Sequence, residues 1–144
     1  MQVSVLLQQK GSDVVTVRPD TTTAEAIDTL ARHRIGAVVV TSDGTSIEGV
    51  LAERDVVLAI SILGSPVLSR PVSEVMSTDV VTCRPETTIE HLMATMTDRR
   101  ARHVPVTSEG RLVGLVSIGD VVKDRISGLE FEARALHDYI SHPY

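Results

Sequence analysis

The feature that most constrains this chain is an internal repeat with an offset of about 66 residues. The run Asp-Val-Val-Thr-Val-Arg-Pro at residues 13–19 returns at residues 79–85 with one change, from Val17 to Cys83. The similarity continues beyond it, and roughly twenty positions are identical between the two halves of the 144 residues, far more than chance allows. A repeat of this length indicates one supersecondary unit used twice, with each copy burying part of the other.

Each copy of the unit predicts the order strand, helix, strand, strand, helix. Runs of β-branched residues bounded by Pro or Gly predict the strands, and a Thr followed three residues later by Glu has the spacing of a capping box at a helix start. In the first copy we expect strands at 13–17, 37–40 and 47–51, a capping box at Thr22–Glu25, and a second helix at 55–62. In the second we expect strands at 79–83, 103–106 and 112–117, a capping box at Thr87–Glu90, and a helix after Asp120. Short lead-in segments precede the copies at 3–10, where we expect a helical turn or two, and at 72–76.

These elements predict an α+β fold of two pseudo-symmetric repeats. Gly64-Ser65-Pro66 and Arg70-Pro71 are chain breakers and mark a linker. We assign residues 3–63 to the first repeat, 64–71 to the linker, 72–126 to the second repeat and 127–144 to a C-terminal helical tail. Because Ser127-Gly128 interrupts its pattern, this tail is either one long helix or two shorter ones. Half of so short a chain buries little apolar surface alone, so we expect the repeats to pack sheet to sheet.

The composition argues against several classes of partner. Aromatic residues make up 2% of the chain and Trp is absent, which removes the stacking platforms that single-stranded nucleic acids require. The net charge of −5 opposes binding to a phosphate backbone. No apolar run approaches the roughly 20 residues that span a bilayer, and the N-terminus is too polar for a signal peptide. Cys83 is the single cysteine, which fits a reducing compartment. We therefore expect a cytoplasmic protein that binds neither nucleic acid nor membrane.

A strand that ends in a short polar run and then opens a helix occurs once in each copy. At residues 114–120 the run is Gly-Leu-Val-Ser-Ile-Gly-Asp, and at 49–55 it is Gly-Val-Leu-Ala-Glu-Arg-Asp. Such a turn presents free backbone N–H groups, and its carboxylate, Asp120 or Asp55, has the chemistry to accept hydrogen bonds from the two hydroxyls of a ribose. The alternative is a plain helix N-cap, with Ser117 as the cap and Asp120 at the positive end of the helix dipole.

Taken together, the motifs resemble a tandem pair of CBS domains, often called a Bateman module, of the small stand-alone bacterial type. The resemblance covers about residues 3–126, and it is carried by Val-Val-Thr-Cys-Arg-Pro at 80–85, Arg-His-Val-Pro-Val at 102–106 and Gly-Leu-Val-Ser-Ile-Gly-Asp at 114–120. Each run is weak evidence alone, but all of them occur in order and have counterparts in the first copy. The resemblance implies a regulatory module without catalysis. Such a module binds an adenosyl ligand, such as AMP, ADP, ATP, NAD(H) or S-adenosylmethionine, in two clefts between the repeats.

The resemblance also implies which residues line these clefts. In each cleft the Asp takes the ribose hydroxyls, backbone and apolar groups hold the adenine, and basic residues at the mouth take phosphate. For the first cleft we expect Asp120, Ser117 and Ile118, together with Lys10, Val14, Val15, Thr16, Ile35, Gly36 and Ala37. For the second we expect Asp55, together with Val80, Val81, Thr82, Arg102, His103 and Val104.

Two departures from the family pattern affect the clefts unequally. Ala52 stands where the family usually has Ser or Thr, so the Asp55 cleft lacks one hydroxyl. Gly36 stands where a phosphate-binding Arg can occur, so the Asp120 cleft draws its positive charge from Lys10 or from a linker residue such as Arg70. We expect the Asp120 cleft to bind AMP more tightly, because the Ser117 hydroxyl meets a buried part of the ligand whereas solvent screens a basic side chain at the other cleft's mouth.

Two other functions are compatible with the same fold. One is a structural dimerisation module with degenerate clefts. The other is a nucleotide-hydrolysing enzyme, although the sequence has no phosphate-binding Gly-rich loop with Lys, no carboxylate cluster for two metals and no nucleophile–base pair. Apolar residues recur in the tail at Ile126, Leu129, Leu136 and Ile140, which indicates either a helix docked on its own domain or a homodimer contact. We expect a homodimer that acts on a downstream protein, which the sequence leaves unidentified.

Overall fold

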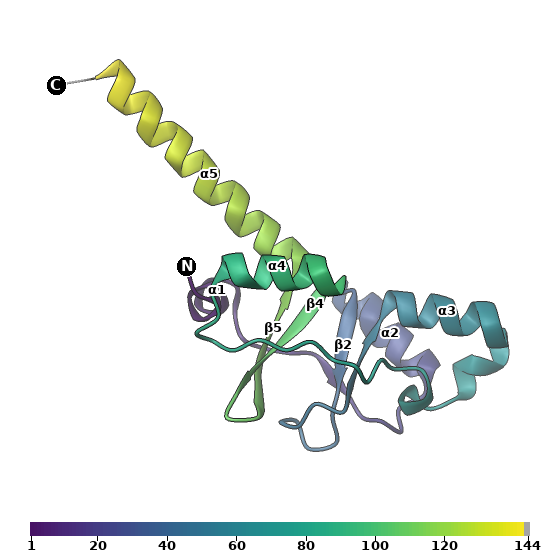
Figure 1. Ribbon diagram of the computed structural model, residues 1–144. Coiled ribbons are helices and arrows are strands. Elements are labelled where there is room, and N and C mark those ends of the chain that lie inside the picture. The colour runs from purple at the N-terminus through teal and green to yellow at the C-terminus, as the bar shows by residue number, and fades with distance from the viewer. Residues whose placement is uncertain (143–144) are drawn as a thin grey trace.

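The computed structural model describes residues 1–142 and contains two small sheets with helices packed on them (Figure 1). The first half of the chain forms α1 (Val3–Lys10), β1 (Thr16–Val17), α2 (Thr23–His33), β2 (Ala37–Val40), β3 (Gly49–Ala52) and α3 (Glu53–Leu63). Two short 3-10 helices, η1 (Ser65–Ser69) and η2 (Val72–Glu74), form the connection. The second half forms α4 (Ile89–Arg99), β4 (His103–Ser108), β5 (Arg111–Ser117) and α5 (Ile118–Ser141). The predicted α+β architecture of two repeats is confirmed.

The two halves build unequal sheets. The first has three strands in the order β1-β2-β3, with β1 parallel and β3 antiparallel to β2. The second is the antiparallel pair of β4 and β5. All four residues of the central strand β2 are buried, which explains why its sequence is a continuous apolar run rather than an alternating one.

The predicted strand at 79–83 is wrong, and Pro105 supplies the physical reason. In the first half, the Val39 N–H donates to the Val15 carbonyl oxygen over 3.4 Å and extends the parallel pairing. Pro105 occupies the same place in the second repeat and has no N–H to donate. Among the described residues of 79–83, one bridge at Cys83 remains. The second sheet therefore keeps only its hairpin.

Other element boundaries differ from the predicted ones in smaller ways. The strand predicted at 13–17 shortens to β1, β3 begins at residue 49, and α3 begins at residue 53. The first predicted capping box is confirmed, because Thr22 Oγ1 accepts from the Glu25 N–H over 3.2 Å and Glu25 Oε2 accepts from the Thr22 N–H over 3.3 Å. The second is wrong, since the N-cap of α4 is Thr88 and its hydroxyl accepts from the N–H of His91.

Each lead-in segment packs on the repeat that it does not precede. Val3 and Leu7 of α1 lie in the core of the second half, where the Val3 N–H donates to the Thr87 carbonyl oxygen over 2.8 Å. Val72 of η2 lies in the core of the first half, and its N–H donates to the Thr21 carbonyl oxygen, also over 2.8 Å. This symmetric exchange holds the two halves together. The hydrophobic core of each repeat includes residues from the lead-in that precedes the other repeat.

The C-terminal segment forms one continuous helix, α5, which extends away from the rest of the molecule and is drawn in yellow in Figure 1. Of the two arrangements predicted for the tail, the single helix is therefore correct. A Cβ added at Gly128 would meet no packed atom within 4 Å, and every described residue from Arg125 to His142 is exposed. The last two residues of the predicted tail, 143 and 144, lie outside the described residues. Neither α5 nor any other described helix combines the length and apolarity needed to cross a membrane.

Candidate functional site

The two strand-to-helix junctions place a carboxylate in the first turn of α3 and of α5. At the second junction Ser117 is the N-cap, and its hydroxyl accepts from the Asp120 N–H over 3.2 Å while Asp120 Oδ2 accepts from the Ser117 N–H over 2.9 Å. At the first junction Asp55 Oδ2 accepts from the Ala52 N–H over 2.8 Å, but Ala52 has no hydroxyl to complete the box. Both carboxylates are thus held at helix N-termini, as the N-cap alternative predicts. Both also line cavities between the two repeats.

The Asp120 cleft is a cavity of about 290 Å³. Most of its predicted residues line it, namely Lys10, Val14, Val15, Ile35, Gly36, Ala37, Ser117 and Asp120. The structure does not bring the other two to this cleft: Thr16 faces a surface groove beside α2, and Ile118 lines the Asp55 cleft instead. The lining is completed by residues that were not predicted for it, Asp13, Arg34, His103 and Leu115.

Lys10 dominates the charge of the Asp120 cleft. Its Nζ donates to Asp120 Oδ2 and to the carbonyl oxygen of Leu115, each over 2.7 Å. Burial by itself raises the pKa of Asp120, but the hydrogen bonds from Lys10 and from the Ser117 N–H outweigh burial and hold that pKa below its usual range. The carboxylate is therefore ionised and already paired with a cation of the protein.

The Asp55 cleft is the larger cavity, at about 560 Å³. Five of its predicted residues line it: Asp55, Val80, Val81, Arg102 and His103. The other two do not, because Thr82 is exposed outside the cavity and Val104 is fully buried in the core. The cleft also contains residues that were not predicted, among them Arg54, Ser77, Asp79, Arg99, Arg100 and Ile118.

Asp55 has a different electrostatic environment from Asp120. Burial raises its pKa, and the Ala52 N–H and the charge of Arg54 offset only part of that effect. The ion pairs within residues 1–142 do not include Asp55. Arg100 and Arg102 give the same cavity a cationic side, while Arg99 pairs there with Asp79 over 3.5 Å. The cleft thus offers a carboxylate for hydroxyl donors and guanidinium groups, which bind phosphate in a planar, bidentate manner.

His103 forms a wall shared by the two clefts. Both His103 and Gly36 line both cavities, and a Cβ added at Gly36 would lie 3.1 Å from the His103 ring. Burial and the charge of Arg102 lower the pKa of His103, while Glu53 and Asp120 partly oppose them. The imidazole is therefore mainly neutral near pH 7, and a larger side chain at Gly36 would require the His103 ring to shift.

Arg34 is a site residue that the sequence analysis missed. It ends α2 in the left-handed conformation, with φ 53°, and lines the Asp120 cleft. Arg100 ends α4 in the same conformation, with φ 52°, and lines the Asp55 cleft. The two arginines are 66 positions apart, so the repeat offset contained the signal. Arg70, the predicted alternative source of charge, instead pairs with Glu74 over 3.1 Å and is not part of the cleft lining.

The chemistry gathered in the clefts suits the binding of a phosphorylated ribose. Cys83 is buried in the core, and burial raises the pKa of its thiol to about 11, which makes the thiol inert. Within the described part of the chain, no three His, Cys, Asp or Glu side chains form a group that could hold a metal ion. What the clefts provide is hydrogen-bond acceptors, apolar walls and guanidinium groups.

Comparisons with known proteins agree with this arrangement. The family model of the CBS domain matches residues 11–62 and again residues 72–126. The chain is 34% identical over 116 residues to the CBS domain-containing protein YhcV of Bacillus subtilis, and the match covers 81% of each. It is also 34% identical over 129 residues to the mitochondrial CBS domain-containing protein CBSX3 of Arabidopsis thaliana, where the match covers 87% of this chain but 63% of that protein.

A solved structure is similar over almost the same span. The crystal structure of the CBS-domain containing protein ATU1752 from Agrobacterium tumefaciens is 49% identical to this chain, with a TM-score of 0.84 over 87% of this chain and 99% of that one. The chain belongs to the family of CBS-domain proteins and carries two CBS domains in tandem.

Proposed function

We propose that the chain is a regulatory module that binds an adenine nucleotide, of the class of AMP, ATP or NADH, mainly in the Asp55 cleft, and performs no chemistry on it. The observation that carries the proposal is the environment of Asp55. Its carboxylate lies at a helix N-terminus in the same cavity as Arg100 and Arg102, and Arg99 lies there too, paired with Asp79. Carboxylate oxygens accept hydrogen bonds from ribose hydroxyls, and guanidinium groups suit phosphate.

The dimensions of the clefts support this choice. Pockets for small ligands commonly measure about 300–1,000 Å³. The Asp55 cleft, at about 560 Å³, lies well inside that range, whereas the Asp120 cleft between the repeats measures about 290 Å³; Asp120 and Lys10 also line a cavity of about 700 Å³ beside α1 and α5. Val80 and Val81 supply an apolar wall for the adenine ring in the larger cleft.

This order of affinity reverses the one expected from the Ser117 hydroxyl. Ser117 already accepts a hydrogen bond from the Asp120 N–H, and Lys10 already occupies an oxygen of Asp120. A ribose in the Asp120 cleft would have to share the Asp120 carboxylate with the Lys10 ammonium group. Asp55, in contrast, has one backbone hydrogen bond from Ala52, and the hydrogen bonds to a ligand there do not require an existing ion pair to break.

Solved structures of the same fold suggest the class of ligand to be tested. One is the structure of CBSX2 in complex with AMP, which is 21% identical to this chain with a TM-score of 0.72. Another is the CBS domain pair of protein MJ0100 in complex with 5′-methylthioadenosine and S-adenosyl-L-methionine, which is 20% identical with a TM-score of 0.76. At such identities the likeness extends to the fold alone, and from their ligands we take only the adenosyl class.

Isothermal titration calorimetry with AMP, ATP and NADH tests the proposal, and GMP controls for the base. Asp55→Ala is expected to weaken the tighter AMP event by about 10- to 150-fold, the scale of hydrogen bonds to a charged group. Asp120→Ala is the matched control and leaves that event nearly unchanged. If Asp120→Ala removes the tighter event instead, the proposed order of the clefts is wrong.

Two further outcomes would overturn the function itself. If the folded protein binds none of the three adenosyl compounds, the clefts are degenerate and the chain is a structural module. If chromatography after long incubation with ATP shows a hydrolysis product that Asp55→Ala abolishes, the chain is an enzyme.

A further inference from the structure

The exposed surface of α5 carries a heptad pattern of apolar residues. Six positions, spaced alternately by four and three residues, form one stripe along the helix: Val122, Ile126, Leu129, Ala133, Leu136 and Ile140. In heptad notation, residues 126, 133 and 140 occupy the a positions and residues 122, 129 and 136 the d positions. We call these six residues the α5 seam. In a parallel coiled coil, Ile at two of the a positions together with Leu at two of the d positions favours two strands.

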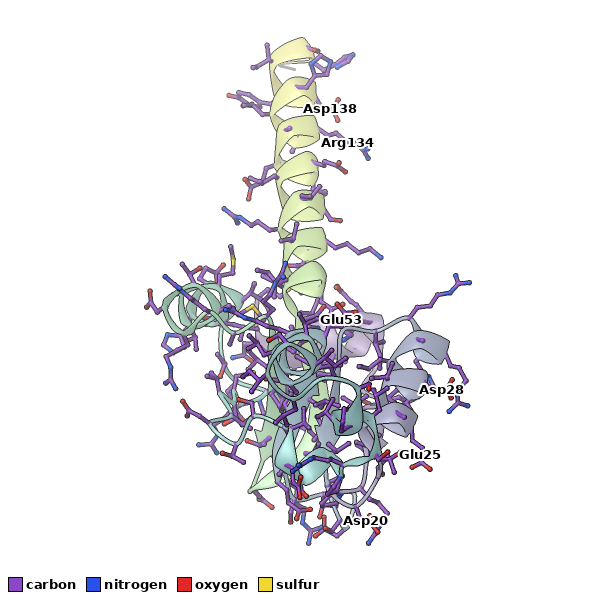
Figure 2. The ribbon with its side chains drawn as sticks, turned by 90° about the vertical axis from the view of Figure 1, so that its right-hand side faces the viewer. Asp20, Glu25, Asp28, Glu53, Arg134 and Asp138 are labelled. Carbon is purple, nitrogen blue, oxygen red and sulfur yellow. The ribbon has the colours of Figure 1, made fainter. Side chains whose placement is uncertain are left out.

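Nothing else in residues 1–142 covers the α5 seam. Leu129 is 48% exposed, Leu136 60% and Ile140 68%. Figure 1 shows α5 leaving the body of the molecule, and Figure 2 shows Arg134 and Asp138 projecting from the same side of its free part. These two residues occupy b and f positions, outside the seam. A helix with an apolar stripe on one side and charges on another is stabilised when the stripe is buried.

The free part of α5 has little stability of its own. It runs from residue 125 to residue 141, which is only slightly longer than the roughly 12–15 residues below which isolated helices are marginal in water. Gly128 lies inside this part and lowers its helix propensity further. Neighbouring elements of the same chain do not compensate, because every residue of this part is exposed. A partner along the seam would supply the missing packing.

We propose that the α5 helices of two copies of this chain pair in parallel as a two-stranded coiled coil. The charges beside the seam indicate that the partner is a second copy of this chain. In a parallel pair, the flanking residues of one helix are complementary to the flanking residues of an identical helix. In a parallel pair, a g residue faces the e residue of the following heptad on the other helix. Arg125 then faces Glu130 of the second copy, an opposite charge, and Glu132 faces the imidazole of His137 of the second copy, which can donate a hydrogen bond. Two-fold symmetry forms each contact twice.

The same charges oppose an antiparallel pair. If the seams overlapped fully in that direction, Val122 would lie across from Ile140 of the second copy. Antiparallel helices place e beside e and g beside g, so Glu130 and Glu132 would each face its own counterpart. Like charges at these flanking positions disfavour pairing, whereas opposite charges set the partner and the orientation. The charge pattern therefore selects the parallel arrangement.

Disulfide cross-linking tests the orientation, with Cys83→Ala in every variant so that the introduced thiol is the single one. Ile140→Cys is expected to give a disulfide-linked dimer as the main product under mild oxidation at low micromolar concentration, because identical a positions meet in a parallel pair. Asp138→Cys is the control at an outward f position and is expected to link slowly. The proposal is overturned if Ile140→Cys links no faster than Asp138→Cys. It is also overturned if a mixture of Val122→Cys and Ile140→Cys proteins links mainly between the two variants, which is the antiparallel result.

Sedimentation equilibrium tests the seam itself. Leu129→Glu combined with Leu136→Glu places charges in the seam and is expected to weaken self-association by about a hundredfold or more. Phe131→Glu is the matched control, since Phe131 is 74% exposed but occupies an f position, and it is expected to change little. Thermal melts followed by circular dichroism verify that the repeats remain folded. If the double variant associates as tightly as the unaltered chain, α5 does not carry the contact and the proposal fails.

Discussion

The side chains of Lys10 and Asp120 are 110 positions apart in the sequence and meet at a distance of 2.7 Å. They meet because α1 packs on the second repeat, where its last residue reaches the first turn of α5. The exchange is symmetric, but Met76 stands 66 positions after Lys10 and brings no charge to Asp55. One cleft therefore contains a cation of the protein, whereas the other leaves its carboxylate for a ligand.

The variant Lys10→Met gives the first lead-in the residue that Met76 provides in the second lead-in. We expect the variant to raise the pKa of Asp120, because burial raises this pKa once the hydrogen bond from Lys10 is gone. We expect a loss of about 1–2 kcal/mol of unfolding free energy at pH 7, the scale of a charged hydrogen bond reduced by solvent screening. NMR titration of the Asp120 carboxyl carbon and urea unfolding measure the two effects. Lys123→Met is the control, because it removes a cation near Asp120 that forms no ion pair with it.

The same pair predicts a dependence on pH. The pKa of Asp120 in the folded protein lies below its ordinary value of 3.8, so the carboxylate contributes stability that is present above pH 3.8 and is lost as the pH falls through the folded pKa. The melting temperatures of the unaltered chain and of Lys10→Met should therefore converge as the pH falls from neutral to about 3. Protonation of Asp120 removes the same ion pair with Lys10 that the substitution removes. Parallel curves over the whole range would contradict this account.

Gly49 in β3 and Gly114 in β5 occupy equivalent positions in the two repeats. The second lead-in packs against Gly49, and the first lead-in, α1, packs against Gly114. A Cβ at Gly49 would lie 2.8 Å from the carbonyl oxygen of Ser77, and one at Gly114 would lie 2.8 Å from the methyl carbons of Leu7. The Ser77 backbone is held by two hydrogen bonds to residue 50, over 2.9 and 3.0 Å, whereas the tip of a leucine can rotate. We expect Gly49→Ala to cost about 2–3 kcal/mol and Gly114→Ala about 1–2 kcal/mol of unfolding free energy.

Denaturant unfolding of the two glycine variants checks this order. Gly128→Ala is the control, because an added Cβ there meets no packed atom within 4 Å and is expected to stabilise the helix by about 0.5–1 kcal/mol. A larger loss for Gly114→Ala than for Gly49→Ala would show that the core around α1 is the more rigid of the two.

Ala52 and Ser117 have nearly the same backbone conformation, with φ −105° and ψ 161° for the first and φ −96° and ψ 162° for the second. Ala52→Ser should therefore place a hydroxyl where it accepts from the Asp55 N–H, and stabilise the protein by about 0.5–1 kcal/mol. Ser117→Ala should destabilise it by about 1 kcal/mol, because it removes the existing cap. Urea unfolding measures both, and a neutral or destabilising effect of Ala52→Ser would show that the first junction is shaped differently from the second.

Asp55→Asn separates stability from ligand binding. Burial raises the pKa of Asp55 above its ordinary value of 3.8, so its favourable contribution is complete below pH 3.8 and is lost as the pH rises through the folded pKa. The neutral amide should therefore stabilise the protein at pH 7, by less than about 1 kcal/mol because the half-buried group is screened by solvent. The gain should vanish near pH 3, and AMP binding should weaken. Calorimetric melts at the two pH values measure the difference, and an equal gain at both would contradict the assigned cause.

The sequence predicted the sites best where a local pattern determines the geometry. The structure brings Val14 and Val15 to one cleft, and their repeat equivalents Val80 and Val81 to the other. The next residue of each run does not line its cleft: Thr16 lies in a groove beside α2, and Thr82 is exposed. The same arrangement recurs because the two runs have the same sequence up to this residue.

The sequence by itself determined the two repeats, their order of helices and strands, the helix caps at Thr22 and Ser117, and the positions of Asp55 and Asp120 at helix starts. Periodicity, chain breakers and capping signals act over a few residues, and the repeat supplies most of them a second time. The exceptions are the strand at 79–83 and the capping box at Thr87–Glu90. The loss of that strand follows from the missing N–H of Pro105 on the neighbouring strand.

Only the tertiary structure decided which repeat each lead-in packs on, that Lys10 rather than Arg70 supplies charge to Asp120, and that the Asp55 cleft is the larger. It also decided that α5 leaves the body of the molecule with its apolar stripe uncovered. These features depend on contacts between segments far apart in the chain, such as the one between Lys10 and Asp120. No local pattern encodes such contacts, because they arise from how the buried surfaces of the two repeats fit together.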